Sequence, residues 1–94
     1  MANYIARVEL HAASYDDYEE LHDKMRQKGF ARQILGSDGK DYHLPTGTYV
    51  IRNTNVSTSD ALNRAVNAAE QTGKKSSIIV ADWDSASWRG LSTD

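Results

Sequence analysis

Two matched helix-start signals constrain the fold of this chain more than any other feature. Ser14 stands three residues before Asp17, and Ser57 stands three residues before Asp60. A cap hydroxyl and a carboxylate at this spacing satisfy two backbone N–H groups that the first turn of a helix leaves free. Apolar or small side chains follow each signal at helical spacing. The sequence therefore predicts two helices, each closed by a glycine: Gly29 and Gly73.

Alternating side chains predict a half-buried strand ahead of the first helix. Residues 4–11 place polar side chains on one side of an extended backbone and apolar ones on the other. The apolar set is Tyr4, Ala6, Val8 and Leu10. A short apolar run at residues 77–83 follows the second helix and predicts a buried strand.

Between the helices, an Asp-Gly pair at 38–39 predicts a hairpin. It separates two β-like runs, residues 30–36 and residues 40–44. Residues 45–47 contain a proline and a glycine and should interrupt the second run. Proline donates no ladder hydrogen bond, and glycine often marks a bulge. The strand is expected to resume at residues 48–52.

The resulting order of elements is β-α-β-β-α-β, the ferredoxin-like arrangement. It predicts a four-stranded antiparallel sheet with two helices on one face, in a single domain over residues 1–94 with an ordered core at about 3–89. Only 17 of the 94 residues are Leu, Ile, Val or Phe, a share below the roughly 20% under which chains of high net charge tend towards disorder. Because the net charge is only −2, we expect a folded chain with a thin core and one sheet face left to water.

Composition narrows the classes of function. The chain contains no cysteine, which excludes a disulfide scaffold and a thiolate metal site. Its near-neutral charge disfavours nucleic-acid binding through bulk electrostatics and leaves local basic patches as the alternative. No run approaches the length of a membrane span, and the N-terminus lacks a signal-peptide pattern. We therefore expect a cytoplasmic protein without membrane association.

The predicted hairpin suggests where chemistry could occur. A two-residue turn at 38–39 would place Ile34 opposite His43 and would direct Leu35 toward the core. A slip of one residue would reverse the two faces. On the predicted register, the open sheet face gathers four candidate catalytic side chains from the first strand and the hairpin: Arg7, His11, Arg32 and His43.

Two imidazoles and a guanidinium group are sufficient for RNA cleavage without a metal ion. One histidine accepts the 2′-hydroxyl proton and the other protonates the leaving 5′ oxygen, while arginine stabilises the phosphorane. The alternative is an ordinary polar strand face that meets water. His22, on the first helix, is interpreted as a helix-flank residue without a role in a site.

A second group of residues combines positive charge with an aromatic ring and is a candidate for RNA binding: Lys24, Arg26, Lys28, Trp88 and Arg89. As an alternative, Lys24, Arg26 and Lys28 stabilise the C-terminal end of the first helix through its dipole. Trp88 could stack on a base or fix the C-terminal segment. The histidine spacing matches no zinc motif, so neither a metal nor another cofactor is expected. Asp82 and Asp84 could seat a divalent cation or form a polar strand end.

Several segments of the chain resemble a family of small bacterial proteins. They are Val-Glu-Leu-His at 8–11, Gly-Phe-Ala-Arg-Gln-Ile at 29–34, Asp-Gly at 38–39, and Tyr-His-Leu-Pro-Thr at 42–46 followed by Tyr49. Together with the order of elements, they are similar, over about residues 4–88, to the GhoS endoribonuclease antitoxins of type V toxin–antitoxin systems.

The resemblance implies a ferredoxin-like ribonuclease that destroys the messenger RNA of a small membrane-lytic toxin. It also implies a fold similar to the small nuclease subunit of CRISPR adaptation, in which an aspartate at the end of the first strand is associated with metal. His11 occupies that place here, which favours a metal-independent mechanism. The resemblance assigns no catalytic residue in this chain.

A non-catalytic binding or regulatory module is the alternative interpretation. Ile5 and Ile34 would lie on the open sheet face, where they could form an apolar patch for dimerisation. The protein is accordingly expected to be a monomer or a homodimer.

Overall fold

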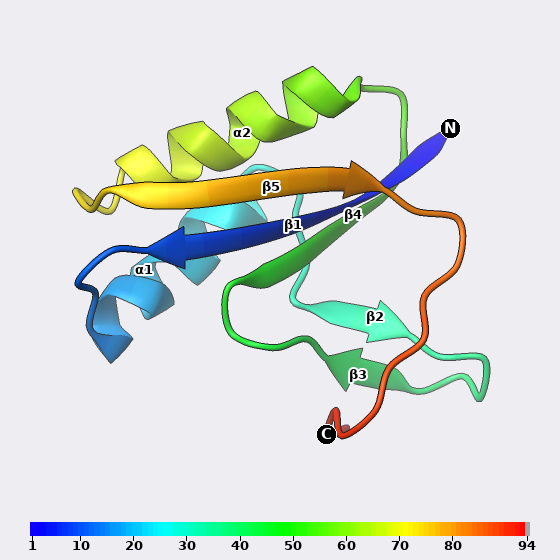
Figure 1. Cartoon of the computed structure of the whole chain (residues 1–94). Helices are drawn as coiled ribbons and strands as arrows, with labels where there is room; N and C mark the ends of the chain where they lie inside the picture. Colours follow the sequence, from blue (N-terminus) through cyan, green and yellow to red (C-terminus); the bar gives the residue numbers. More distant parts are fainter. Residues whose placement is uncertain (94) are drawn as a thin grey trace.

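The computed structural model describes residues 1–93 as a small α+β protein (Figure 1). In chain order the elements are β1 (Ala2–Leu10), α1 (Tyr15–Gln27), β2 (Gln33–Leu35), β3 (Asp41–His43), β4 (Thr48–Thr54), α2 (Thr58–Glu70) and β5 (Ser76–Asp82). Three strands form an antiparallel sheet in the order β4-β1-β5, and β2 pairs with β3 in a separate antiparallel hairpin. Within these residues, no helix has the length and apolar character needed to cross a membrane.

Both helices begin where the sequence predicts. The Ser14 hydroxyl accepts a hydrogen bond of 3.3 Å from the Asp17 N–H, and the Asp17 carboxylate accepts one of 2.8 Å from the Ser14 N–H. At α2, the Ser57 hydroxyl accepts a hydrogen bond of 3.1 Å from the Asp60 N–H. Local capping therefore sets the start of each helix independently of the rest of the fold.

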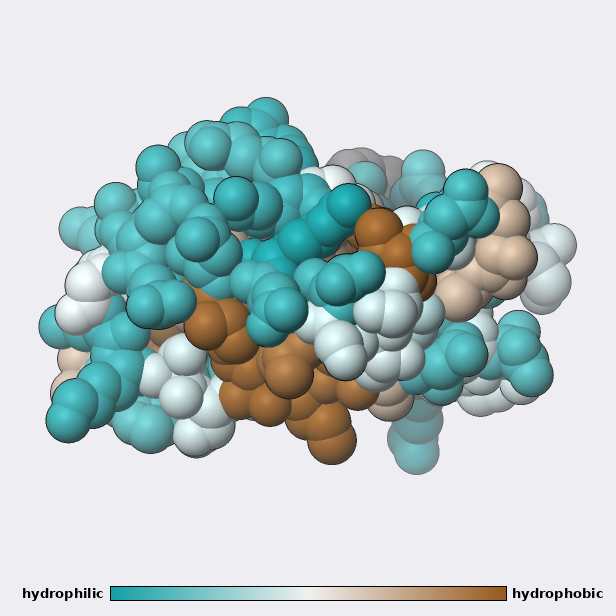
Figure 2. Space-filling model, turned by 90° about the horizontal axis from the view of Figure 1, so that it is seen from above, coloured by the Kyte–Doolittle hydropathy of each residue, from teal (hydrophilic) through white to brown (hydrophobic). Residues whose placement is uncertain are grey.

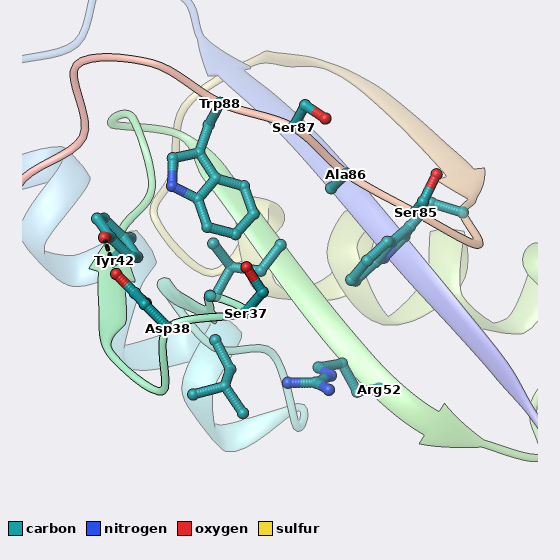
Figure 3. A pocket seen from close by; sticks show the side chains of 12 residues that line it. Ser37, Asp38, Tyr42, Arg52, Ser85, Ala86, Ser87 and Trp88 are labelled. Atoms are coloured by element: carbon teal, nitrogen blue, oxygen red, sulfur yellow. Dashed lines mark hydrogen bonds between the residues drawn. The ribbon is translucent and has the colours of Figure 1, made fainter.

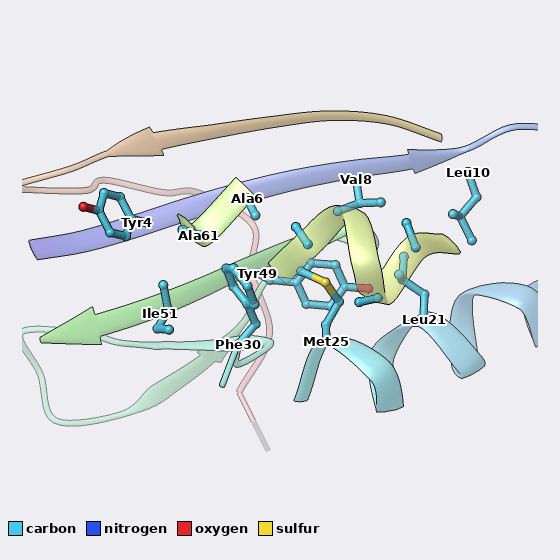
Figure 4. Packing of buried hydrophobic residues seen from close by; sticks show 13 residues of the cluster. Tyr4, Ala6, Val8, Leu10, Leu21, Met25, Phe30, Tyr49, Ile51 and Ala61 are labelled. Atoms are coloured by element: carbon cyan, nitrogen blue, oxygen red, sulfur yellow. The ribbon is translucent and has the colours of Figure 1, made fainter. Parts of the chain in front are cut away.

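The helices pack against one face of the three-stranded sheet. Leu21 and Met25 of α1 belong to one buried cluster with residues of β1 (Figure 4). The β1 residues are those that alternation predicts: Tyr4, Ala6, Val8 and Leu10. From α2 the cluster takes only small side chains, Ala61, Ala65, Ala68 and Ala69. Because these side chains are short, α2 can lie close to the sheet.

The prediction of a fourth strand in the sheet is wrong. The chain after α1 meets β4 at one bridge, where Ala31 and Val50 exchange backbone hydrogen bonds of 2.7 and 2.9 Å. From Gln33 onward it pairs with β3 instead. Pro45 and Gly47 separate β3 from β4, as the sequence predicts. This break lets β3 leave the line of β4, and β2 follows β3 away from the sheet.

The predicted hairpin register is also wrong, by one residue. Ile34 pairs with Tyr42 rather than with His43. The reason is a longer turn over residues 36–40, closed by a hydrogen bond of 2.8 Å from its first N–H to its last carbonyl oxygen. The shift buries Ile34, which is 2% exposed, and leaves Leu35 48% exposed. The two faces of β2 are therefore the reverse of the prediction, whereas those of β3 are not.

The second sheet face is covered at one end, which corrects the expectation of a fully open face. Ile34, Leu44 and Val50 form a second buried cluster between the hairpin and the sheet. Side chains from β1, the hairpin and the C-terminal segment pack against it: Ile5, Tyr42, Trp83, Trp88 and Leu91. Since Ile34 is buried in this cluster and Ile5 packs against it, the two side chains do not form the expected exposed patch for dimerisation. Ile79 of β5 stays 66% exposed.

Candidate functional site

A pocket of about 470 Å³ lies between α1 and the chain that leads into β2. We call it the histidine pocket, and its lining residues are Glu19, His22, Asp23, Arg26, Phe30, Ala31, Arg32, Gln33 and His43. Two imidazoles, two guanidinium groups and two carboxylates therefore line one cavity.

Helix periodicity and the hairpin register bring these side chains together. Four residues of α1 share one helix face because they stand at positions i, i+3, i+4 and i+7: Glu19, His22, Asp23 and Arg26. Gln33 pairs with His43, so their side chains lie on one face of the hairpin. The bridge between Ala31 and Val50 anchors the start of the hairpin beside α1.

His22 lies between the core and the pocket. Its Nδ1 atom is 2.6 Å from the Tyr49 hydroxyl oxygen, and its side chain is 11% exposed. Burial lowers the pKa of His22, and the charge of Arg32 lowers it further, whereas the smaller effect of Glu19 raises it. Burial raises the pKa of Tyr49, so its hydroxyl stays protonated. At neutral pH the pair is an uncharged imidazole hydrogen-bonded to a neutral phenol.

The two arginines of the pocket differ in their contacts. Arg26 donates a hydrogen bond of 2.8 Å to the Asp23 carboxylate in an exposed ion pair. The Arg32 side chain is exposed, and its guanidinium group forms no hydrogen bond or ion pair with any residue in the range 1–93. A guanidinium group presents planar donors that match two phosphate oxygens. Arg32 is thus the pocket cation best placed to contact a phosphate.

The structure brings together two of the four predicted catalytic residues. His43 and Arg32 line the histidine pocket, whereas Arg7 and His11 lie elsewhere. The His11 Nε2 atom is 2.8 Å from the Ser77 hydroxyl of β5, and the Arg7 guanidinium donates a hydrogen bond of 3.0 Å to a carbonyl oxygen in the β3–β4 connection. The end of β1 lies away from the β2–β3 hairpin (Figure 1), because the neighbours of β1 are β4 and β5.

The five predicted RNA-binding residues do not form one surface. Arg26 lines the histidine pocket, and Trp88 lines a different cavity, on the other side of the hairpin. Lys24 and Lys28 are half-buried on α1, and Arg89 is exposed in the C-terminal segment. These three residues line neither cavity.

His22 is the candidate residue that sequence interpretation missed. Its place at the edge of the apolar stripe of the helix indicates a flank residue. Its hydrogen bond to the Tyr49 hydroxyl joins α1 to β4, and the two residues are 27 positions apart in the sequence. No local pattern shows which residue of a strand a helix side chain will meet. The sequence does contain one indication of a functional helix face: Glu19 and Arg26 stand three and four positions from His22.

Comparison with known proteins gives no family for this chain. No family model matches the sequence, and no curated protein matches it significantly. In the part of the chain that the structure describes, no group of three or more His, Cys, Asp or Glu side chains is arranged to hold a metal ion. The chemistry of the pocket residues is therefore the basis on which a function can be proposed.

Proposed function

We propose that the protein is a small ferredoxin-like endoribonuclease that cleaves single-stranded RNA in the histidine pocket without a metal ion. The observation that carries the proposal is the environment of His22. Its imidazole is neutral, hydrogen-bonded to Tyr49, and lines the same cavity as Arg32. A second imidazole, from His43, lines that cavity too. General acid–base cleavage of RNA needs two such groups and a cation for the phosphorane.

In the proposed reaction, His22 is the general base. The tautomer protonated on Nδ1 donates to the Tyr49 oxygen and leaves the Nε2 lone pair to accept the 2′-hydroxyl proton. The 2′ oxygen then bonds to phosphorus, the bond from phosphorus to the 5′ oxygen breaks, and His43 protonates that oxygen. Arg32 stabilises the negative charge of the phosphorane. The products are a 2′,3′-cyclic phosphate and a 5′-hydroxyl.

The resemblance to GhoS antitoxins supports a class of substrate. The element order, and β1 between β4 and β5 in the sheet, are compatible with the ferredoxin-like fold that the resemblance implies. On this basis the proposed substrate is the messenger RNA of a small toxin, and the proposed place of action is the cytoplasm.

Incubation of the purified protein with a toxin messenger and an unrelated messenger, with and without EDTA, tests the proposal. We expect selective cleavage of the toxin messenger that EDTA does not prevent. Arg32→Ala should lower the cleavage rate about a hundredfold, whereas Lys75→Ala removes an exposed charge beside β5 and should have no effect. Cleavage that EDTA abolishes, or an Arg32→Ala variant as active as the wild type, contradicts the proposal.

A second candidate function is a non-catalytic module that self-associates through β5. This strand is at the edge of the sheet, and its Ile79 side chain is 66% exposed. Figure 2 shows an apolar patch beside the hydrophilic surface of α2. Free backbone groups of an edge strand can pair with a second copy. Light scattering should then detect a dimer that Ile79→Lys dissociates, and a wild-type monomer at every concentration contradicts this function.

A further inference from the structure

A second cavity, of about 630 Å³, lies between the β2–β3 hairpin and the segment that follows β5 (Figure 3). We call it the tryptophan cleft. The residues that decide its chemistry are Asp38, Tyr42, Arg52, Trp83 and Trp88. They come from the hairpin, from β4 and from the segment after β5, so the cleft exists only in the folded chain.

Aromatic side chains form much of the cleft. The sequence contains two tryptophans, and both line it. The rings of Trp88 and Tyr42 are in contact, with centroids 5.3 Å apart and planes tilted by 54°, which restricts the orientation of the indole. Both tryptophans are half-buried, so part of each side chain remains accessible. Accessible aromatic rings around a cavity are suited to stack on a planar base.

Two hydrogen-bond donors of the cleft lack partners within residues 1–93. The Arg52 side chain is exposed, extends from β4 into the cleft (Figure 3), and makes no hydrogen bond or ion pair with those residues. The indole N–H of Trp83 is buried and has no acceptor among them. A buried donor without an acceptor is destabilising. The Trp83 N–H is closed to a ligand in the cleft, whereas the exposed Arg52 guanidinium group would pair with an anionic ligand.

Asp38 adds an acceptor to the cleft. It accepts a hydrogen bond of 2.6 Å from the Tyr42 hydroxyl, and this bond lowers the pKa of the Asp38 carboxyl. The carboxylate is therefore ionised at neutral pH, and it can accept a hydrogen bond from an exocyclic amino group of a base. The cleft thus combines aromatic surfaces, an acceptor and a cation, which suit the base and the phosphate of a nucleotide.

We propose that the tryptophan cleft binds one nucleotide of single-stranded RNA, with the base on the aromatic side chains and the phosphate on Arg52. This inference rests on the proposed RNA substrate. Ile34 and Tyr42 line the cleft. Their strand neighbours Gln33 and His43 line the histidine pocket, so the two cavities lie on opposite faces of the hairpin. An RNA strand held in the cleft can pass around the hairpin to the pocket, and the cleft then selects a nucleotide near the cleavage site.

Tryptophan fluorescence measures occupancy of the cleft, since both tryptophans line it. The probes are adenosine monophosphate and a 2′-O-methyl RNA hexamer, which lacks the attacking hydroxyl and cannot be cleaved. We expect the hexamer to quench the fluorescence and to bind at least tenfold more tightly than adenosine monophosphate. Arg52→Gln should weaken hexamer binding about tenfold, whereas Lys75→Gln should bind like the wild type.

The His22→Gln variant separates this inference from the proposed function. Hexamer binding that survives in this variant while cleavage is lost supports both. Hexamer binding by a wild type that cleaves no RNA supports the cleft and refutes the endoribonuclease. Absence of quenching at millimolar hexamer, or an Arg52→Gln variant that binds like the wild type, overturns the cleft assignment. Adenosine monophosphate that binds as tightly as the hexamer overturns RNA as the ligand and identifies a free nucleotide instead.

Discussion

At the scale of single residues, Tyr49 connects the hydrophobic core to the histidine pocket. Its ring is fully buried in the core cluster, and its hydroxyl is hydrogen-bonded to His22. The position of the imidazole is therefore fixed by the packing of α1 against β4. The same burial lowers the pKa of His22, so the ring is uncharged at neutral pH, as a general base requires.

The Tyr49→Phe substitution tests this connection. It keeps the buried ring and removes the hydroxyl, so we expect the free energy of unfolding to fall by about 1 kcal/mol and RNA cleavage to slow. Tyr4→Phe is the matched control, because the Tyr4 hydroxyl donates a hydrogen bond of 2.8 Å to the Val56 carbonyl oxygen, outside the pocket. Urea unfolding and cleavage rates should show a similar loss of stability in both variants and slow cleavage in Tyr49→Phe alone. Equal cleavage rates would contradict the role of the Tyr49 hydroxyl.

The lowered pKa of His22 predicts how stability depends on pH. As the pH falls below about 6.5, the unfolded chain binds a proton at His22 before the folded protein does, so this residue lowers stability in acid and has no such effect at higher pH. His22→Gln removes this component. Urea unfolding at pH 7.5 and pH 5.5 should therefore show a smaller loss of stability in the variant than in the wild type. An equal loss in both proteins would show that the pKa of His22 is not lowered in the folded state.

At the scale of elements, the hairpin decides which side chains enter which cavity. The left-handed conformation of Gly47, with φ of +83°, and the hydrogen bond of 2.7 Å from the Val8 N–H to the Gly47 carbonyl oxygen hold the β3–β4 connection against β1. The hairpin register then directs alternate residues to opposite faces. Ile34 enters the second buried cluster, and His43 enters the histidine pocket.

Neighbouring hairpin residues provide a test of this register. Ile34→Ala should lower the free energy of unfolding by about 3 kcal/mol, because it leaves a cavity in a buried cluster. Leu35→Ala changes an exposed side chain and should cost less than about 0.5 kcal/mol. Chemical denaturation of both variants measures the difference. A larger loss in Leu35→Ala would instead support the two-residue turn that the sequence suggests.

The same elements show why only part of the fold could be predicted from the sequence. The caps at Ser14 and Ser57 and the alternation of β1 depend on neighbouring residues, and the structure confirms them. The turn over residues 36–40 could not be predicted, since Asp-Gly suits several turn lengths and one added residue reverses the faces of β2 relative to β3. The histidine pocket could not be predicted for the same reason, and because Tyr49, the partner of His22, lies on a strand that is distant in the sequence.

At the scale of the whole molecule, a sheet with few large apolar residues is stabilised from both sides. The helices cover one face, and the hairpin with the C-terminal segment covers one end of the other. The low content of Leu, Ile, Val and Phe is thus compensated by two small clusters, in which tyrosines, tryptophans and alanines fill much of the space. Both cavities border the hairpin, so this covering element, rather than the open sheet, carries the proposed chemistry.

The rate of RNA cleavage in EDTA, compared between His22→Gln and His11→Gln, tests the central claim most directly. The two substitutions are chemically identical, but His22 lines the histidine pocket and His11 contacts Ser77 at the edge of the sheet. The proposed mechanism predicts that His22→Gln loses cleavage by at least a hundredfold while His11→Gln cleaves like the wild type. Loss of cleavage in His11→Gln with full activity in His22→Gln would contradict the proposed mechanism and would place the active site on the open sheet face instead.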